Sequence, residues 1–157
     1  MLRGTFPIID LERFESNDSA TRRDAIRELD EACQHIGFLI IRNHGVSASV
    51  QQALFNEGLA FFDLTLAEKL LVRRPRNDQN RGYIPYGEET LARMHGGDTP
   101  PDYKEVFAIG PTDRPDDEYH AEENSYPNFA ANLWPRNPPN LETAMRAYFF
   151  ELEALSY

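Results

Sequence analysis

The chain lacks what a disulfide-bonded or membrane-spanning protein would need. Its single cysteine, Cys33, excludes an intramolecular disulfide, and no apolar run approaches the length of a membrane span. A lone cysteine fits a reducing compartment, so we expect a cytoplasmic protein. Cys33 falls on the apolar face of a predicted helix, where a small buried side chain is expected and not a nucleophile.

Basic residues are also scarce. Lys and Arg number 16 against 26 Asp and Glu, which gives a formal net charge of −10. A broad acidic field repels phosphate backbones and anionic lipid, so we expect neither nucleic acid nor a membrane surface as a partner. With 157 residues, of which 41% are hydrophobic, the chain is long enough for one domain with a core.

Common catalytic motifs are missing as well. The sequence has no glycine-rich dinucleotide motif after a strand, no Walker loop and no nucleophile elbow. The serines at positions 47 and 49 are typical of helix caps. None of these residues therefore predicts a nucleophilic or phosphate-binding site.

The four histidines do not form a convincing metal-binding pattern. A facial-triad iron site needs two histidines and one carboxylate. His120 and Glu122 have a suitable spacing, but no histidine comes after them and both lie in an acidic, proline-rich stretch. His95 lies in a glycine-rich turn, His35 near a helix end, and His44 in a turn after a strand. We therefore expect structural roles for them and no metal ligand.

The strongest secondary-structure signal is at residues 37–45. Four large apolar residues lie between two glycines there, which predicts a strand buried on both faces and followed by a polar turn. A short strand is predicted at 6–11. Between the two, a capping box at 21–24 and an apolar stripe predict a helix that Gly37 ends. The order predicts a strand–helix–strand crossover, and leaves open whether the strands are neighbours.

Helices and short strands are expected in the rest of the chain. One helix is capped by Ser47 or Ser49, and a second begins at the capping box of Thr65 and Glu68 and runs to about Arg73. Short strands are predicted at 83–84 and 103–109. Residues 111–140 are acidic, rich in proline and predicted to be irregular, with an apolar anchor at 132–135.

A last helix is predicted from Asn140 onward. It has no visible end signal, and its final turns are strongly apolar. We expect the natural protein to continue beyond this helix, because an uncovered apolar helix face favours association. The alternative is a helix that ends the protein against its own core.

Arg81 and Tyr83 are the best candidate ligand-binding residues. An arginine beside a glycine can present its planar fork to a carboxylate, and a nearby tyrosine adds a hydroxyl group. The alternative is an ordinary loop with a packing tyrosine.

Six short motifs occur in an informative order. They are PIIDL at 7–11, GFLIIRNHG at 37–45, FFDL at 61–64 with EK at 68–69, RGY at 81–83, DYKEVFAIG at 102–110 and NLWP at 132–135. Each is weak alone, but together they cover essentially the whole chain. The series resembles the N-terminal half, or non-haem dioxygenase N-terminal domain, of isopenicillin N synthase-like iron(II)- and 2-oxoglutarate-dependent oxygenases. Its series of motifs is most similar to that of the bacterial members of this family.

The resemblance implies an α+β fold in which a helix-and-strand module buttresses a double-stranded β-helix, or jelly roll, whose catalytic part is missing from this chain. It divides the chain into the N-terminal domain at 1–110, an acidic, proline-rich connecting loop at 111–139, and the start of a long helix at 140–157. The C-terminal barrel is then a partner of this chain.

The resemblance also implies the cofactors. Iron(II) and 2-oxoglutarate belong to the complete enzyme and neither is expected to bind this chain alone, because the family's His-x-Asp pair, distal histidine and Arg-x-Ser lie in the C-terminal half. No catalytic or metal residue is therefore assigned here. Arg81 and Tyr83 are expected to bind a small-molecule substrate, because the matching region faces the active site in some members.

Two other interpretations remain open. The chain can be a stand-alone binding or interaction module that has kept the scaffold and lost the barrel, with the apolar last helix as its partner surface. It can also be an unrelated small acidic enzyme.

Overall fold

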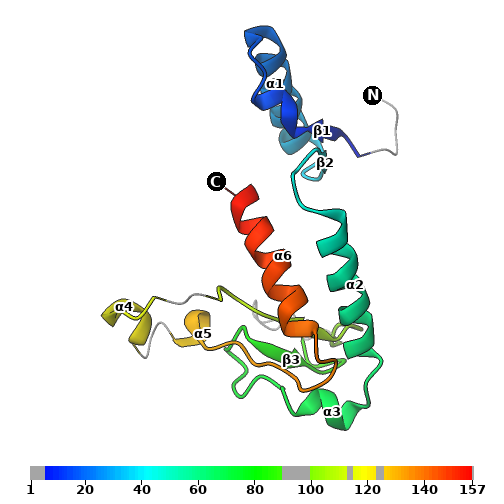
Figure 1. Cartoon of the computed structure of the whole chain (residues 1–157), viewed down its shortest axis with the longest axis vertical. Helices are drawn as coiled ribbons and strands as arrows, with labels where there is room; N and C mark the ends of the chain where they lie inside the picture. The colour runs from blue at the N-terminus through cyan, green and yellow to red at the C-terminus, as the bar shows by residue number, and fades with distance from the viewer. Residues whose placement is uncertain (1–5, 90–99, 113–114, 123–125, 157) are drawn as a thin grey trace. The chain divides into compact units, whose positions relative to one another are not determined.

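The computed structural model describes residues 6–89, 100–112, 115–122 and 126–156. The chain divides into two compact units, one formed by residues 1–46 with 153–157 and the other by residues 47–152. Figure 1 shows the course of the chain through its helices and strands. Both units mix helices with two-stranded sheets, as predicted for an α+β protein.

The first unit is a strand–helix–strand crossover. Strands β1 (Ile8–Asp10) and β2 (Ile40–Arg42) are parallel neighbours, with Ile9 opposite Ile41. The 3-10 helix η1 (Leu11–Phe14) and helix α1 (Ser19–His35) connect them. Ile9 is 2% exposed and lies with the buried Ala25 and Ala32 of α1 in this unit's small core. The crossover prediction is confirmed, and the two strands pair directly.

The predicted burial of the second strand is wrong. Within the described part of this unit, Ile40 is 50% exposed and Phe38 is 71% exposed. A two-stranded sheet has two faces, and the unit supplies one long helix to cover them. An apolar run therefore predicted a strand correctly, but burial depends on a second covering layer that the run itself does not encode.

Helix α1 begins earlier than predicted. Its cap is Asp18, whose carboxylate accepts hydrogen bonds from the N–H groups of Ala20 and Thr21 at 3.2 and 3.0 Å. The hydroxyl of Thr21 also donates to Asp18, at 2.7 Å. The predicted capping box at 21–24 is wrong, because Asp18 satisfies the free N–H groups one turn earlier. Gly37, with φ of 76°, ends the helix as predicted.

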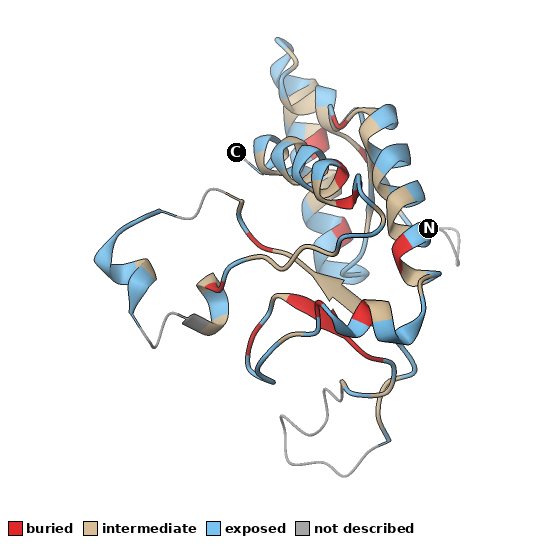
Figure 2. Ribbon diagram, turned by 60° about the horizontal axis from the view of Figure 1, so that its bottom comes forward, coloured by how far each residue is buried: buried red, intermediate tan, exposed pale blue. Residues whose placement is uncertain are grey.

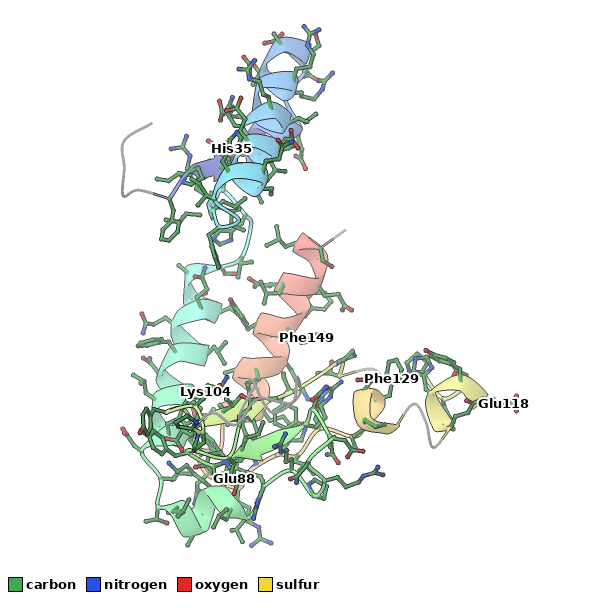
Figure 3. All side chains as sticks on the ribbon, turned by 180° about the vertical axis from the view of Figure 1, so that it is seen from behind. His35, Glu88, Lys104, Glu118, Phe129 and Phe149 are labelled. Atoms are coloured by element: carbon green, nitrogen blue, oxygen red, sulfur yellow. The ribbon has the colours of Figure 1, made fainter. Side chains whose placement is uncertain are left out.

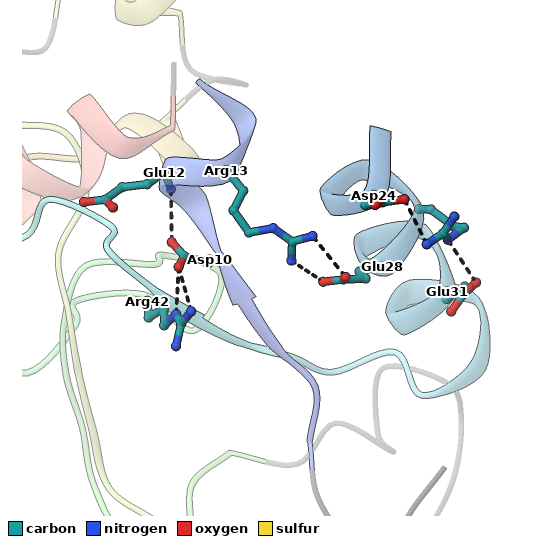
Figure 4. A network of polar contacts seen from close by, with 8 residues as sticks. Asp10, Glu12, Arg13, Asp24, Glu28, Glu31 and Arg42 are labelled. Atoms are coloured by element: carbon teal, nitrogen blue, oxygen red, sulfur yellow. Dashed lines mark hydrogen bonds and ion pairs between the residues drawn. The ribbon is translucent and has the colours of Figure 1, made fainter. Parts of the chain in front are cut away.

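Ion pairs connect the elements of the first unit, as Figure 4 shows. Asp10 at the end of β1 accepts from Arg42 of β2 at 2.8 Å and from Asn43 at 2.9 Å. Arg13 of η1 pairs with Glu28 of α1 through both carboxylate oxygens. The first contacts hold the carboxyl ends of the two strands together. The Arg13–Glu28 pair holds the 3-10 helix against α1.

The second unit contains most of the helices. Its elements are α2 (Ala48–Phe62), α3 (Leu66–Leu70), β3 (Gly82–Ile84), β4 (Val106–Ala108), α4 (Glu118–Ala121), α5 (Tyr126–Phe129) and α6 (Leu141–Leu155), the last belonging to this unit as far as Leu152. Strands β3 and β4 are antiparallel, with Tyr83 opposite Phe107. The stretch predicted to be irregular thus contains two short helices.

The capping box of α3 is confirmed. The N–H of Glu68 donates to the Thr65 hydroxyl at 3.3 Å, and the N–H of Thr65 donates to the Glu68 carboxylate at 3.1 Å. The helix ends at Leu70 and not near Arg73, because Arg73 forms a parallel bridge with Tyr83. The chain after α3 is therefore already part of the sheet region.

The core of the second unit surrounds β3, which is buried along its whole length (Figure 2). Phe61, Val72, Tyr83 and Leu141 are all buried there, and Leu133 of the predicted apolar anchor packs against them. Gly82 has φ of 104°, and a Cβ there would lie 2.7 Å from the carbonyl oxygen of Val72. A close approach of two backbones thus requires glycine at this position.

None of the helices in the described ranges is both long enough and apolar enough to cross a membrane.

Candidate functional site

Arg81 lies directly before β3, with its guanidinium partly buried. Nη1 donates to the carbonyl oxygen of Asn80 at 2.6 Å, and Nη2 donates to that of Asn128. Nε is buried and has no hydrogen-bond acceptor among the described residues. Burial lowers the pKa of Arg81 from its usual value, because the charged form loses solvation.

Gly110 makes room for the Arg81 guanidinium. A Cβ at Gly110 would overlap Nη2, Cζ and Nε of Arg81. The Asn132 amide holds Gly110 in place: its oxygen accepts from the Gly110 N–H at 2.8 Å and its nitrogen donates to the Gly110 carbonyl at 3.0 Å. The guanidinium therefore lies over bare backbone that two hydrogen bonds fix to the NLWP segment.

A pocket of about 300 Å³ opens beside Arg81. Its polar and aromatic lining comes from Arg81, His120, Phe129, Asn132, Trp134 and Arg146. The Arg146 guanidinium lies 5.3 Å from the centre of the Trp134 ring, and its Nε donates to Glu142 at 2.9 Å. Figure 3 labels Phe129 on α5. The pocket thus combines two guanidinium groups with aromatic walls.

The residues His120 and Asp117 form a polar pair at the edge of this pocket. Nδ1 of His120 lies 2.7 Å from Oδ1 of Asp117, and its ring lies 4.5 Å from that of Phe129. The backbone N–H of His120 donates to the same carboxylate oxygen at 2.9 Å. The Asp117 pKa is lowered by these two hydrogen bonds.

Tyr83 lies in the core and does not line the pocket. It is 1% exposed, and its hydroxyl donates to the carboxylate of Glu105, which also pairs with Nζ of Lys69 at 2.8 Å. Nζ of Lys69 donates further to the carbonyl oxygen of Phe62 at 3.0 Å. Burial and the negative charge of Glu105 raise the pKa of Tyr83. Of the two predicted ligand-binding residues, the structure brings Arg81 to the pocket, and substrate binding by either stays a prediction.

The histidines have separate surroundings. Nδ1 of His44 accepts from the N–H of Val46 at 3.1 Å, which confirms the predicted turn role. His35 ends α1. His95 lies outside the described residues. Within the described ranges, no three His, Cys, Asp or Glu side chains gather as a metal site would require, so these residues do not fit an iron centre.

Several pocket residues could not be found by sequence reasoning. Arg146 has the pattern of an exposed helix residue with an i,i+4 partner in Glu142. Gly110, which lies under the Arg81 guanidinium and does not itself line the pocket, has the pattern of a strand end. Trp134 and Asn132 did carry a signal, since they belong to the apolar anchor, but the signal predicted packing and not a ligand site.

The fold is an α+β scaffold, and it places a pocket lined by Arg81 and Arg146 next to a small antiparallel sheet. Over residues 6–137 the chain matches the family described as non-haem dioxygenase in morphine synthesis N-terminal. This match covers more than half of the chain. The chain belongs to this family of dioxygenase N-terminal domains.

Curated relatives agree with the family. Validamycin A dioxygenase of Streptomyces hygroscopicus subsp. limoneus is 32% identical over 149 residues, which are 94% of this chain and 39% of that protein. A 2-oxoglutarate-Fe(II) type oxidoreductase of Aspergillus fumigatus is 31% identical over 96% of this chain and 41% of its own length. The chain thus spans about 40% of the length of these relatives.

A solved structure has the same fold. A full-length Neurospora crassa protein, crystallised in complex with alpha-KG, matches with a TM-score of 0.72 and 25% identity, over 96% of this chain and 44% of that one. The prediction of the family is confirmed.

Proposed function

We propose that the chain is the N-terminal part of an iron(II)- and 2-oxoglutarate-dependent oxygenase that oxidises a small molecule with release of succinate and carbon dioxide. One observation carries the proposal: the match to Validamycin A dioxygenase takes in 94% of this chain but 39% of that protein. Residues 1–110 then form the N-terminal domain, 111–139 the connecting loop, and 140–157 the start of the helix that leads to the catalytic barrel.

In this proposal the chain contributes scaffold and one side of the substrate pocket. The core around Tyr83 fixes β3, and β3 in turn fixes Arg81, which directly precedes it. The Gly110–Asn132 hydrogen bonds fix the surface on which the guanidinium lies. In this proposal the iron ligands and the 2-oxoglutarate site belong to the barrel. Among the described residues no three His, Cys, Asp or Glu side chains gather as a metal site would require.

The face shared by α2 and α6 is proposed as the surface that the C-terminal barrel covers. A hollow of about 310 Å³ lies there, lined almost entirely by apolar side chains. Phe55 and Leu59 of α2 line this hollow and are 63% and 52% exposed. Exposed apolar area of this kind favours a protein partner, and the unmatched length of the relatives argues that the partner is a further segment of the same protein.

The coding sequence after Tyr157 tests the proposal. Continuation into a His-x-Asp pair and a distal histidine is the expected result. A stop codon in an intact gene would overturn it. An iron(II) titration is a second test: we expect no stoichiometric binding to the 157-residue chain, and tight binding would place the metal site here.

The second candidate is a stand-alone interaction module without catalysis. The exposed Phe55 and Leu59 favour it equally, because a separate protein could cover the same face. The two candidates differ in whether the coding sequence continues after residue 157, so the same sequencing result separates them.

A further inference from the structure

Arg81 carries a partly buried positive charge. An arginine has five N–H groups, and Arg81 uses two of them, on the carbonyl oxygens of Asn80 and Asn128. Among the described residues no carboxylate pairs with it, and the buried Nε has no acceptor. Withdrawing a guanidinium from water without a counterion is unfavourable, and such groups at pocket walls are enriched in functional sites.

We propose that the pocket beside Arg81 binds a small molecule that carries a carboxylate group on an aromatic ring. The carboxylate pairs with the Arg81 guanidinium, and the ring lies between the Phe129 and Trp134 walls. The ligand's role as substrate rests on the proposed oxygenase function, whereas binding itself depends on this pocket alone.

The charge of the pocket selects an anion. Two guanidinium groups line it, and two described carboxylates near it are paired: Glu142 with Arg146 and Asp117 with His120. The fork of a guanidinium matches the planar geometry of a carboxylate. The described residues that line the pocket include no Asp or Glu, although the chain as a whole has a net charge of −10.

The aromatic walls and the size of the pocket select a ring. Phe129 and His120 meet edge to face at 4.5 Å, and Arg146 holds the Trp134 indole from one side at 5.3 Å. Along the chain between Phe129 and Trp134, the pocket is lined by the small Ala130 and Ala131 and by Asn132. A volume of about 300 Å³ is at the lower end of small-molecule sites, which suits a single-ring acid.

Benzoate and its neutral analogue benzamide test the proposal. Trp134 is the single tryptophan of the chain. It lines this pocket and also a second hollow beside Leu71 and Arg136, so the quenching that depends on Arg81 is the part that reports on this pocket. Titration of the full chain, without iron or oxygen, is expected to give saturable quenching by benzoate and at least tenfold weaker binding of benzamide. Equal responses to the two compounds, or no response to benzoate up to about 50 mM, a concentration beyond the weak-binding range, would overturn the proposal.

Variants of Arg81 locate the contact. Arg81→Gln is expected to weaken benzoate binding at least tenfold, and Arg81→Lys several-fold, because lysine keeps the charge and loses the fork. Arg76→Gln is the matched control: Arg76 is exposed, pairs with Asp78 and lies outside the pocket lining. Circular dichroism and thermal unfolding check that each variant is folded. Unchanged affinity in a folded Arg81→Gln would contradict the assignment.

Gly110→Ala tests the position of the guanidinium while keeping its charge. The added methyl group would occupy the place of the Arg81 guanidinium, and Gly110 does not have the positive φ that would strain alanine. We expect benzoate binding to fall about as far as in Arg81→Gln. Gly58→Ala is the control, because a Cβ there meets no atom within 4 Å.

The carboxylate could come from an aromatic substrate or from 2-oxoglutarate, and a third titration separates them. We expect 2-oxoglutarate to bind this pocket more weakly than benzoate, because it has no ring for the Phe129 and Trp134 walls. Tighter, Arg81-dependent binding of 2-oxoglutarate would overturn the aromatic part of the proposal. None of these titrations needs turnover, so a failed pocket assignment leaves the oxygenase function untouched, and a stop codon after Tyr157 leaves the pocket untouched.

Discussion

Arg81 and Tyr83 are two residues apart, but their polar groups have opposite surroundings. The Tyr83 hydroxyl belongs to a closed cluster in which Glu105 accepts from Tyr83 and from Lys69, and Lys69 also donates to a backbone carbonyl. Arg81 has two carbonyl acceptors and no described carboxylate. A satisfied cluster of buried polar groups serves stability. We infer a ligand site where a partly buried charge has no counterion among the described residues, and on this inference the difference separates scaffold from function.

The glycines beside these two residues give the largest expected contrast. Gly82→Ala would force alanine to φ of 104° and place its Cβ 2.7 Å from the Val72 carbonyl oxygen. Backbone strain and overlap together should lower the free energy of unfolding by about 3 to 4 kcal/mol. Gly110→Ala should lower it by less than about 1 kcal/mol, because the three atoms nearest to its Cβ belong to the guanidinium of Arg81, the far end of a flexible side chain. Urea unfolding of both variants measures the contrast, and equal losses would contradict it.

Lys69→Met should break the closed cluster. The variant leaves Glu105, whose side chain is 27% exposed, with the Tyr83 hydroxyl as its remaining described partner. Removing one partner of a mostly buried ion pair should cost about 3 kcal/mol. Lys104→Met is the control, because Lys104 and Glu89 are more exposed and their ion pair should contribute less than about 1 kcal/mol. A small effect of Lys69→Met in urea unfolding would mean that the cluster adds little stability.

The pH dependence of stability should report the charge of Glu105. Burial alone would raise its pKa, but hydrogen bonds from Lys69 and Tyr83 outweigh burial and lower it. A carboxyl whose folded pKa is lowered stabilises the protein above its unfolded pKa, about 4.3, and this stabilisation disappears as pH falls through the folded value. Wild type should therefore exceed Glu105→Gln by about 2 kcal/mol at pH 7.

The same difference is expected to shrink as the pH falls below about 4, because Glu105 then becomes protonated and resembles the amide. Urea unfolding of both proteins at a series of pH values measures it. A constant difference across the series would mean that the charge of Glu105 makes no contribution.

Local chemistry explains which parts of this fold could be predicted from the sequence. The Thr65–Glu68 capping box closes within one helical turn, so four residues were enough to place the start of α3. The prediction of where α1 starts was wrong, because Asp18 and Thr21 can both cap a helix and local sequence does not choose between them. In the structure Asp18 is the cap, and the Thr21 hydroxyl donates to its carboxylate.

Burial and the site depend on contacts between distant segments, which local patterns do not specify. The apolar residues around Ile40 predicted a strand, but their exposure depends on what covers the sheet. The pocket needs Arg81, Gly110, Asn132 and Arg146, which belong to four separate segments. Arg81 could be predicted as a candidate ligand-binding residue, because an arginine beside a glycine can present its guanidinium fork to a carboxylate. The residues around Arg81 in the site, Gly110, Asn132 and Arg146, could be identified only in the folded structure.

Arg81→Met should have the smallest effect on stability and so sharpens the comparison most. Methionine loses the two hydrogen bonds to Asn80 and Asn128, at about 1 kcal/mol each, and also removes the cost of keeping an unpaired guanidinium partly out of water. These contributions oppose each other, so the free energy of unfolding should change by less than about 1 kcal/mol, far less than in Lys69→Met. Binding of benzoate, followed by Trp134 fluorescence, should be lost in the same variant. Strong destabilisation in urea unfolding would instead place Arg81 with Lys69, among the residues that hold the scaffold together.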